Sequence, residues 1–131
     1  MLFRSDNVFG NHGFNYEASN DYKTSTIRWY LNFDILSKLV SKGANPLPAN
    51  FPDVGCTDKV WLLSVDEAKR IPRNIRDFRE DDWWLRSRGI RTDYAACVGT
   101  YGYVNDHGEY VHYNYVAVRP AIIINKNELM K

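Results

Sequence analysis

Two adjacent tryptophans, Trp83 and Trp84, constrain the fold of this chain more than any other feature. They stand between a charged segment, 76–82, and Gly89, and Leu85 continues the apolar run. Neighbouring side chains of a β-strand point to opposite faces, so at least one ring must enter the core, and the other needs a cover or a partner. The run therefore predicts a central strand in which both tryptophans and Leu85 are structural residues.

Two arginines, Arg86 and Arg119, stand inside apolar segments that we predict to be strands. A charge that is buried without a partner is costly, so each guanidinium needs an acidic or polar neighbour in the fold. We therefore expect both arginines to be structural residues, held in an ion pair with an acidic side chain such as Asp58.

The chain has 131 residues, a size that fits one domain, 1–131, with a single core. Its formal net charge of +1 gives no electrostatic reason to expect binding to nucleic acid or to an anionic membrane surface. The apolar runs are too short to span a membrane, and the sequence lacks the pattern of a signal peptide. We therefore expect a soluble protein, whose oligomeric state stays open.

The two cysteines, Cys56 and Cys97, lie far apart, and no histidine is close to either of them in the sequence. A zinc site needs more ligands at closer spacing, so we predict no metal site and no cofactor. The favoured interpretation is two free, buried thiols in a reducing compartment. A single disulfide, which would indicate an oxidising setting, is the alternative.

The first of two predicted helices lies between residues 25 and 43. Ser25 is a candidate N-cap, apolar side chains recur at every fourth position from 27 to 39, and Gly43 is suited to the C-terminal end. Asn32 and Asp34 interrupt this pattern and are candidates for a break into two pieces.

The second helix is predicted to begin at Ser64. Ser64 and Glu67 have the spacing of a capping box, in which each side chain accepts a hydrogen bond from the backbone N–H of the other residue. The helix is expected to run to about Ile71 and to end at Pro72. A charged, irregular connector follows over 75–82.

The remaining segments predict β-strands and loops. Strands are expected within 2–9, at 59–63, 94–98 and 116–124, and in a hairpin whose arms, 102–104 and 109–112, flank a turn at 105–108. Residues 10–20 and the proline-rich residues 45–55 are predicted loops. Pro120 lacks an N–H and is expected at a bulge or an unpaired edge. Together these elements predict an α+β fold, with two helical segments packed on a twisted, mainly antiparallel sheet.

Three phrases of the sequence are similar to motifs of a known group of domains: S-T-I-R-W-Y-L-N at 25–32, T-D-K-V-W-L-L-S at 57–64, and W-W-L-R-S at 83–87 with V-R-P-A at 118–121. The group carries S-x-I-R-x-W-L-N, T-D-K-V-F-L-L-S, W-W-L-R-S and V-R-P-A, so Tyr30 stands here in place of a tryptophan. Their order and spacing resemble those of a family of uncharacterised bacterial and phage domains, over residues 2–124. That family is similar to a divergent branch of the C-type-lectin-like fold. The resemblance therefore implies this fold, in a protein of the cytoplasm or of a phage particle.

Calcium-dependent lectins of the wider fold bind the ion through Glu-Pro-Asn and Trp-Asn-Asp motifs. No Glu-Pro-Asn occurs here, and Asn105 with Asp106 matches only part of the second motif. Calcium needs roughly six to eight oxygen ligands, so we do not carry this metal site over to the chain.

Catalysis is not expected from the sequence. The three histidines, His12, His107 and His112, are not close to a cysteine or to a serine in a nucleophile motif. The acidic pairs at 66–67 and 81–82 are accounted for by a helix start and by surface charge. An enzyme of unknown reaction is therefore the weakest functional hypothesis.

Binding is the stronger hypothesis. Tyrosine offers a large rigid ring with a hydroxyl group, asparagine offers an adaptable amide, and both are typical of paratopes. Such residues are concentrated in one segment and form the candidate binding site: Tyr101, Tyr103, Asn105, Asp106, His107, Tyr110, His112, Tyr113, Asn114 and Tyr115. A solvated β-sheet whose tyrosines only cover its face is the structural alternative.

The leading functional hypothesis is a non-catalytic recognition module that binds a protein or a glycan through this tyrosine-rich hairpin. The alternative is a small inhibitor, encoded by a phage or mobile element, that binds and blocks a host defence protein. Of the tyrosines at 101, 103, 110 and 113, at least two are expected to be exposed. The loop around Phe14 and Tyr16 is the next candidate for the site.

Overall fold

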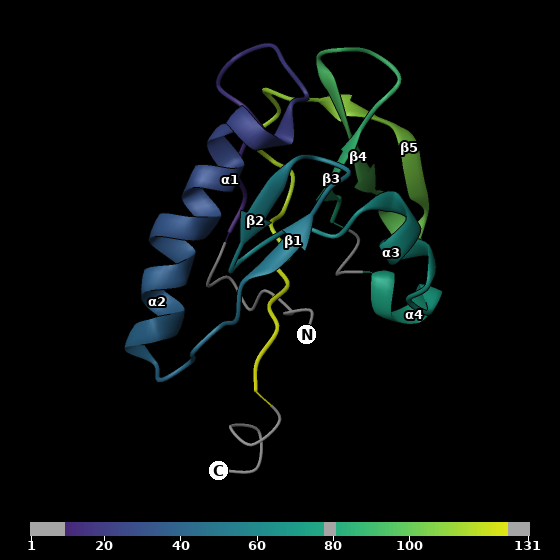
Figure 1. Ribbon diagram of the computed structural model, residues 1–131. Helices are drawn as coiled ribbons and strands as arrows, with labels where there is room; N and C mark the ends of the chain where they lie inside the picture. Colours follow the sequence, from purple (N-terminus) through teal and green to yellow (C-terminus); the bar gives the residue numbers. More distant parts are fainter. Residues whose placement is uncertain (1–9, 78–80, 126–131) are drawn as a thin grey trace.

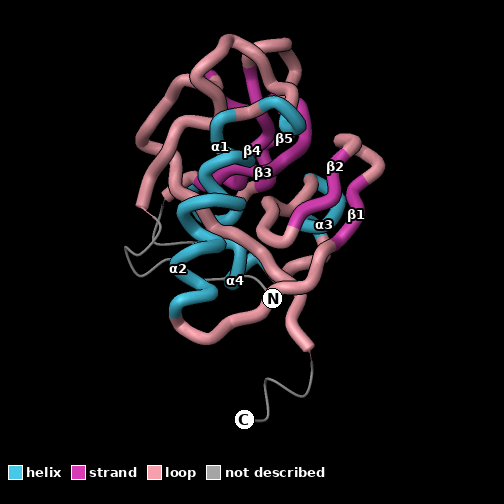
Figure 2. Tube along the Cα trace, turned by 60° about the vertical axis from the view of Figure 1, so that its left-hand side comes forward, coloured by secondary structure: helices cyan, strands magenta, loops and turns pink. Residues whose placement is uncertain are grey.

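The computed structural model describes residues 10–77 and 81–125, and its helices and antiparallel sheets confirm the predicted α+β class (Figure 1). A long helical segment lies along one side of the molecule. Figure 2 shows a two-stranded sheet standing apart from a three-stranded one. The strand predicted within 2–9 lies outside the described residues.

The long helical segment follows a short 3-10 turn, Tyr22–Thr24, and changes its winding midway. It consists of α1 (Thr26–Tyr30), a π-helical turn (Leu31–Ile35) and α2 (Leu36–Ser41). Four residues of an α-helix cover about 40° more than a full turn about the helix axis. Side chains at every fourth position would therefore drift gradually away from the core face. The wider π-turn removes this drift, and the apolar residues at 27, 31, 35 and 39 are all buried. The predicted break is this π-turn.

Both ends of the segment are capped as predicted. Ser25 Oγ accepts a hydrogen bond from Arg28 N over 3.2 Å. At the other end Gly43 has a φ of 92°, and the next residue, Ala44, donates its N–H to the Leu39 carbonyl over 3.0 Å. This is a Schellman motif, which pairs helix carbonyls that would otherwise have no partner.

Residues 45–63 differ from the prediction. The proline-rich stretch contains a short strand, β1 (Ala49–Phe51), which pairs antiparallel with β2 (Cys56–Asp58). The strand predicted at 59–63 is wrong, because the ladder is complete at Asp58. Trp61 meets only Ala121, in an isolated bridge, and a single bridge does not extend a sheet.

The capping box of Ser64 and Glu67 is present at the start of α3 (Val65–Lys69). Pro72 follows this helix and stands at the start of another short helix, α4 (Arg73–Arg76). Proline is tolerated there because the N–H groups of a first helical turn have no intrahelical acceptor. This helix replaces the beginning of the connector that we predicted to be irregular.

The central sheet contains three antiparallel strands in sequence order: β3 (Trp83–Arg88), β4 (Tyr94–Val98) and β5 (Val104–Tyr110). The first two are the predicted strands. The predicted hairpin is wrong, because β5 runs through the residues assigned to its turn.

Residues 106–108 instead form a bulge within β5. Pairing with β4 holds on both sides of them, so they stand opposite the single residue Ala96. Asn105 Oδ1 accepts a hydrogen bond from Gly108 N over 3.1 Å, and Gly108 has a φ of 91°. The turn-forming residues therefore do bend the backbone, but the ladder resumes and the chain keeps its direction.

Residues 116–124 cross the molecule without forming the predicted strand. Three of them form isolated bridges to different segments: Ala117 with Asn11 and Trp83, Ala121 with Trp61, and Ile123 with Leu47. Pro120 lies between the first two sets of bridges, and its missing N–H prevents a continuous ladder. The segment therefore joins the central sheet to the chain that flanks the small sheet.

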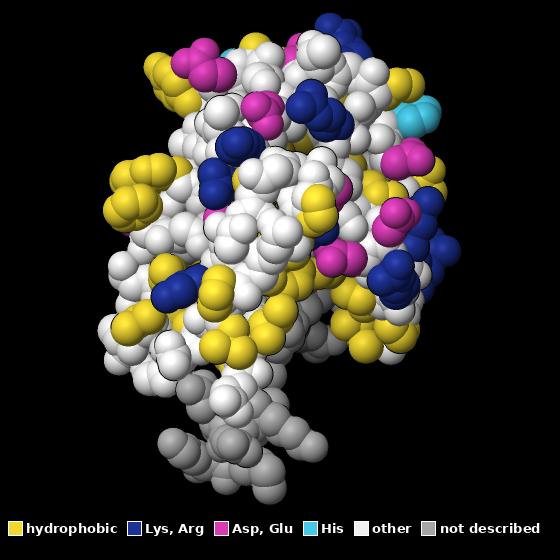
Figure 3. All heavy atoms as spheres, viewed as in Figure 1, with side chains coloured by type: hydrophobic (Ala, Val, Ile, Leu, Met, Phe, Trp, Pro, Cys, Tyr) yellow, Lys and Arg dark blue, Asp and Glu magenta, His cyan; other side chains and the backbone are white. Residues whose placement is uncertain are grey.

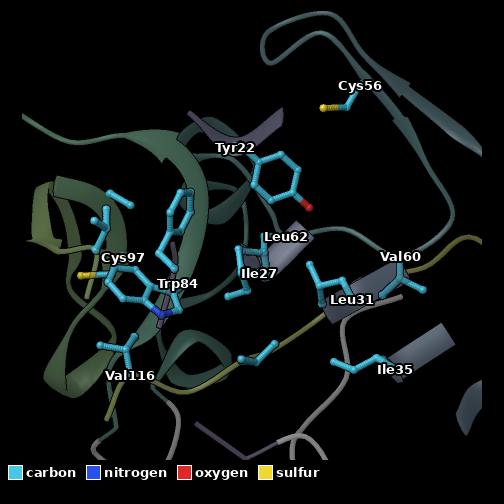
Figure 4. Packing of buried hydrophobic residues seen from close by; sticks show 14 of the residues in the cluster. Tyr22, Ile27, Leu31, Ile35, Cys56, Val60, Leu62, Trp84, Cys97 and Val116 are labelled. Atoms are coloured by element: carbon cyan, nitrogen blue, oxygen red, sulfur yellow. The ribbon is translucent and has the colours of Figure 1, made fainter. Parts of the chain in front are cut away.

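Two hydrophobic clusters form the core, and β3 contributes to both. Trp84 belongs to the cluster that includes the long helix, whereas Trp83 and Leu85 belong to the cluster that includes Phe51 of β1. Both tryptophans are fully buried, so packing covers the second ring. Figure 4 shows the first cluster, with Trp84 and the helix residue Ile27 facing the same interior.

The buried carboxylate Asp58 does not bind either predicted arginine. Its side chain is 5% exposed and pairs with Arg28, with Nη2 and Oδ1 2.9 Å apart. Arg28 lies at the start of the long helix, beside the end of β2, and this proximity decides the pairing.

Arg86 and Arg119 are both buried, and each has other partners. Arg86 pairs with Asp53, at 3.0 Å, and with Glu67 of the capping box. Arg119 lies over the ring of Trp83, 4.7 Å from its centre, and donates to the Ile75 carbonyl over 3.0 Å. The expected partner Asp58 is therefore replaced by acidic side chains at Arg86, and by a ring and a backbone carbonyl at Arg119.

Candidate binding surface

The predicted tyrosine-rich site is divided between the two ends of β5. Tyr101 and Tyr103 precede the strand, and Tyr101 lies beside α4, where Arg73 Nε donates to the Tyr101 carbonyl over 3.0 Å. Tyr110 ends the strand and is paired with Tyr94 at the opposite end of the sheet. The expected site, a single tyrosine-rich hairpin, is therefore divided, because the predicted hairpin does not form.

The polar residues between the two ends have different surroundings. Asn105 is partly buried and uses its carbonyl oxygen on Gly108 within the bulge. Asp106 and His107 are exposed, and so is Asn114, which lies beyond the strand. None of these residues lines the hollow described below.

Four tyrosines and a histidine form a contiguous tyrosine cluster at the far end of β5. The members are Tyr94, Tyr110, His112, Tyr113 and Tyr115, joined by ring contacts with centroids 4.8 to 6.5 Å apart. Tyr113 and Tyr115 stack at 5.0 Å, yet they remain 41% and 54% exposed. Of the four tyrosines named in the expectation, Tyr101, Tyr103 and Tyr113 are exposed, so at least two are exposed as predicted.

A hollow of about 660 Å³ adjoins this cluster and shares His112 with it. We call it the histidine groove; it is lined by His12, Gly13, Asn15, Tyr16, Thr26 and His112. Phe14, which we had considered with Tyr16, is fully buried below it and contacts Trp84 edge-on at 5.5 Å.

Backbone hydrogen bonds fix the walls of the histidine groove. Phe14 N donates to the Val111 carbonyl over 2.9 Å, and His12 N donates to the Val116 carbonyl over 3.1 Å. Asn15 Oδ1 accepts from Thr26 Oγ1 over 3.2 Å, which ties the loop to the start of α1. The groove is therefore a preformed feature of the backbone.

His12 has one ring nitrogen committed to the fold. Nδ1 lies 2.6 Å from the Gly13 carbonyl, which can only accept, so Nδ1 carries the proton. The ring stacks on Tyr30 at 4.4 Å. In the neutral imidazole, Nε2 is then the acceptor that remains for a ligand.

Sequence reasoning found His112 and three of the cluster tyrosines, Tyr110, Tyr113 and Tyr115. It missed Tyr94 of the cluster and His12, Asn15 and Thr26 of the groove. The loop 10–20 did give a signal, because it is rich in glycine, asparagine and aromatic residues. What the sequence did not reveal is that this loop runs beside residues 111–116.

Residues 1–126 match a protein family described as a domain of unknown function, DUF6273. The chain belongs to this family. No curated protein and no solved structure matches it.

In this DUF6273 domain, a pair of partly buried carboxyls lies apart from the histidine groove. Burial, and then the charge of Asp81, raises the pKa of Asp82. Burial, and then Asp82, raises the pKa of Glu109. Such pairs are typical of acid–base sites and also of structural networks, and neither carboxyl lines the groove.

The two cysteines of the DUF6273 domain are free and buried, in line with the favoured interpretation. Burial, followed by the charges of Asp82 and Glu109, raises the pKa of the Cys97 thiol. Burial also raises the pKa of Cys56. Both thiols are therefore protonated at neutral pH, and a protonated thiol is a poor nucleophile.

Within the described part of the DUF6273 domain, no group of three or more His, Cys, Asp or Glu side chains could hold a metal ion. No helix there is long and apolar enough to cross a membrane. What these residues do offer is a rigid aromatic surface beside a hollow, which is chemistry suited to recognition.

Proposed function

We propose that this domain is a non-catalytic recognition module that binds a protein or a glycan at the tyrosine cluster and the adjoining histidine groove. The observation that carries the proposal is the exposure of Tyr113 and Tyr115, which stack on each other and still leave about half of their surface open to solvent. Tyrosine rings in such positions are typical of binding surfaces.

The rigidity of the surface supports this proposal. Tyr113 N donates to the Tyr110 carbonyl over 3.0 Å, and Val111 N donates to the Asp93 carbonyl over 2.9 Å. The ring of Tyr110 contacts both His112 and Tyr113. Binding to a surface that is already ordered loses less conformational entropy than ordering a mobile loop.

The histidine groove adds polar recognition to the aromatic surface. His12 Nε2 is a free acceptor in the neutral ring, and His112 lies where the groove meets the cluster. Rings alone would bind apolar faces with little selectivity, whereas a few placed polar atoms orient a ligand. A glycan or a protein loop would be able to contact both parts.

The resemblance of the motifs to a bacterial and phage branch of the C-type-lectin-like fold is consistent with a binding role. A small inhibitor of a host defence protein would use the same surface, and the neighbourhood of the gene would separate the two roles.

The test pairs binding with thermal melting on the same proteins. The double variant Tyr113→Ala/Tyr115→Ala and the control Tyr103→Ala, at the other end of β5, are compared with the wild type on a glycan array and in capture from host lysate. We expect the double variant to lose every bound ligand while its Tm stays within about 4 °C, the shift that roughly 1 kcal/mol causes in a domain of this size. Tyr103→Ala should bind normally.

Two results would contradict the proposal. If the double variant keeps all ligands of the wild type, the cluster is not the site. If only Tyr103→Ala loses them, the binding surface lies at the α4 end of the sheet.

A further inference from the structure

We propose that a second hollow, at the start of the long helical segment, binds small carboxylates that carry a ring. The hollow measures about 350 Å³, and its lining includes Lys23, Arg28, Trp29, Asn32, Phe33 and Asp58. It shares no lining residue with the histidine groove, so it is a separate site.

A stacked aromatic pair forms one wall of this hollow. The rings of Trp29 and Phe33 lie 4.1 Å apart at an interplanar angle of 17°, and the side chains are 60% and 55% exposed. Both lie on the face of the helix that points away from the buried row at 27, 31, 35 and 39. Figure 3 shows hydrophobic side chains protruding at the left edge of the molecule, the side along which α1 runs. The pair offers an uncovered platform for another ring.

A fixed guanidinium stands beside the platform. Arg28 donates from Nε and Nη2 to Asp58, at 2.9 to 3.1 Å, and from Nη1 to the Lys23 carbonyl over 2.8 Å. These bonds hold the planar group in one orientation. Guanidinium has five N–H groups, so N–H groups on both terminal nitrogens have no partner among the described residues. Lys23 adds an ammonium group to the rim of the hollow.

Most side-chain oxygens of the hollow already accept a hydrogen bond, and the Thr24 hydroxyl donates to Asp21 over 3.2 Å. Both carboxylate oxygens of Asp58 accept from Arg28. Asn32 Oδ1 accepts from the backbone N–H groups of Lys59 and Val60, at 3.3 and 3.1 Å, and Ser25 Oγ accepts from Arg28 N. Asp58 balances the charge of Arg28, so the hollow offers a ligand N–H donors and the net positive charge of Lys23, but few acceptors.

This asymmetry selects the chemistry of the ligand. A sugar hydroxyl both donates and accepts, whereas a carboxylate only accepts and forms strong, charge-assisted bonds to Arg and Lys. A ring attached to that carboxylate would lie on Trp29 and Phe33. An aromatic acid and a uronic acid share these two features, and the experiment below distinguishes them.

Fluorescence quenching can report binding at this hollow, because Trp29 is exposed there. The other tryptophans of the chain are buried: Trp61, Trp83 and Trp84. The full chain is titrated with phenylacetate, with galacturonate and with the neutral 2-phenylethanol while tryptophan fluorescence is followed. We expect saturable quenching by one or both acids and none by the alcohol. The acid that quenches the fluorescence at the lower concentration shows whether the site prefers an aromatic acid or a uronic acid.

Variants locate the binding. Trp29→Ala should abolish binding, measured by ligand-observed NMR because the fluorescent reporter is lost, and Lys23→Gln should weaken it by up to about fivefold, the range of an exposed ion pair. Val40→Ala removes an exposed apolar side chain of the same helical segment outside the hollow and serves as the control. The melting temperature of each variant separates loss of binding from loss of folding.

Three results would overturn the proposal: no saturable binding of either acid, equal binding of the alcohol, or unchanged acid binding by a folded Trp29→Ala variant. In the last case Trp29 and Phe33 only stabilise the helix, as neighbours at four-residue spacing can.

Discussion

The indole Nε1 of Trp84 donates a hydrogen bond over 2.7 Å to the carbonyl oxygen of His12. Trp84 is fully buried in the central strand, whereas His12 lines the histidine groove. One side chain therefore belongs to the core and also fixes the backbone of the candidate site. A variant that loses this donor leaves a buried carbonyl without its partner, in addition to any loss of packing.

Trp84→Ala is expected to lower the free energy of unfolding by about 3–5 kcal/mol, the usual cost of removing a buried tryptophan. Leu85→Ala should cost about 2–5 kcal/mol while leaving the His12 ring signals in the NMR spectrum unshifted, because Leu85 lies in the other cluster. Denaturant titration measures both effects. Unchanged midpoints for both variants would mean that β3 is peripheral to stability.

Glu67→Ala is expected to destabilise the domain by about 1–3 kcal/mol, since it removes an N-terminal cap and a partner of the buried Arg86. The matched control is Asp66→Ala, an exposed acidic residue in the same helical turn, whose effect should stay within about 0.5 kcal/mol. Thermal or denaturant unfolding compares the two. Equal effects would show that only the negative charge near the helix start matters.

Glu109→Gln is expected to stabilise the domain at neutral pH and to flatten its pH dependence. The pKa of Glu109 is raised in the folded state, by burial and then by Asp82, so the folded chain binds the proton more tightly than the unfolded chain. The free energy of unfolding then falls as pH rises from about 4.3, the ordinary value for Glu, through the raised pKa of the folded state.

Unfolding of the wild type and of Glu109→Gln at a series of pH values measures this contribution. Glu17→Gln, at an exposed position in the loop 10–20, is the control and should leave the profile unchanged. A Glu109→Gln profile parallel to that of the wild type would contradict the predicted linkage.

Calcium and a chelator are each expected to leave the Tm unchanged, because the described residues contain no group of three or more His, Cys, Asp or Glu side chains that could hold a metal ion. An ion that binds only the folded state would raise the Tm with increasing concentration. Differential scanning fluorimetry across a calcium series is sufficient. A concentration-dependent rise would point back to the acceptor oxygens of Asn105 and Asp106.

The parts of the fold that follow from local chemistry were predictable. Ser25, Gly43 and the Ser64–Glu67 pair cap helices through bonds to residues close in sequence, and the structure contains all of them. The hairpin error has a different cause. Residues Asn105 to Gly108 can bend the backbone either in a hairpin turn or in a bulge, and pairing with β4, which lies outside this segment, decides between the two.

The same limit applies to the candidate site. The exposed tyrosines could be predicted from their number within a short segment. The groove could not, because His12 and His112 come from opposite ends of the chain and meet only through backbone bonds to Val111 and Val116. The Asp58 pairing failed for a similar reason, because Arg28 becomes its neighbour only once the helix packs beside β2.

The bridges formed by residues 116–124 also bear on how this domain is made in the cell. Ala117, Ala121 and Ile123 connect to partners near residues 11, 83, 61 and 47, so the last part of the described chain closes contacts with much earlier segments. Contacts between such distant residues slow folding, because the intervening chain must first be ordered. We expect the nascent chain to remain incompletely folded on the ribosome until residue 123 has left the exit tunnel. During that interval the apolar surfaces around Trp61 and Trp83 would depend on chaperones for protection.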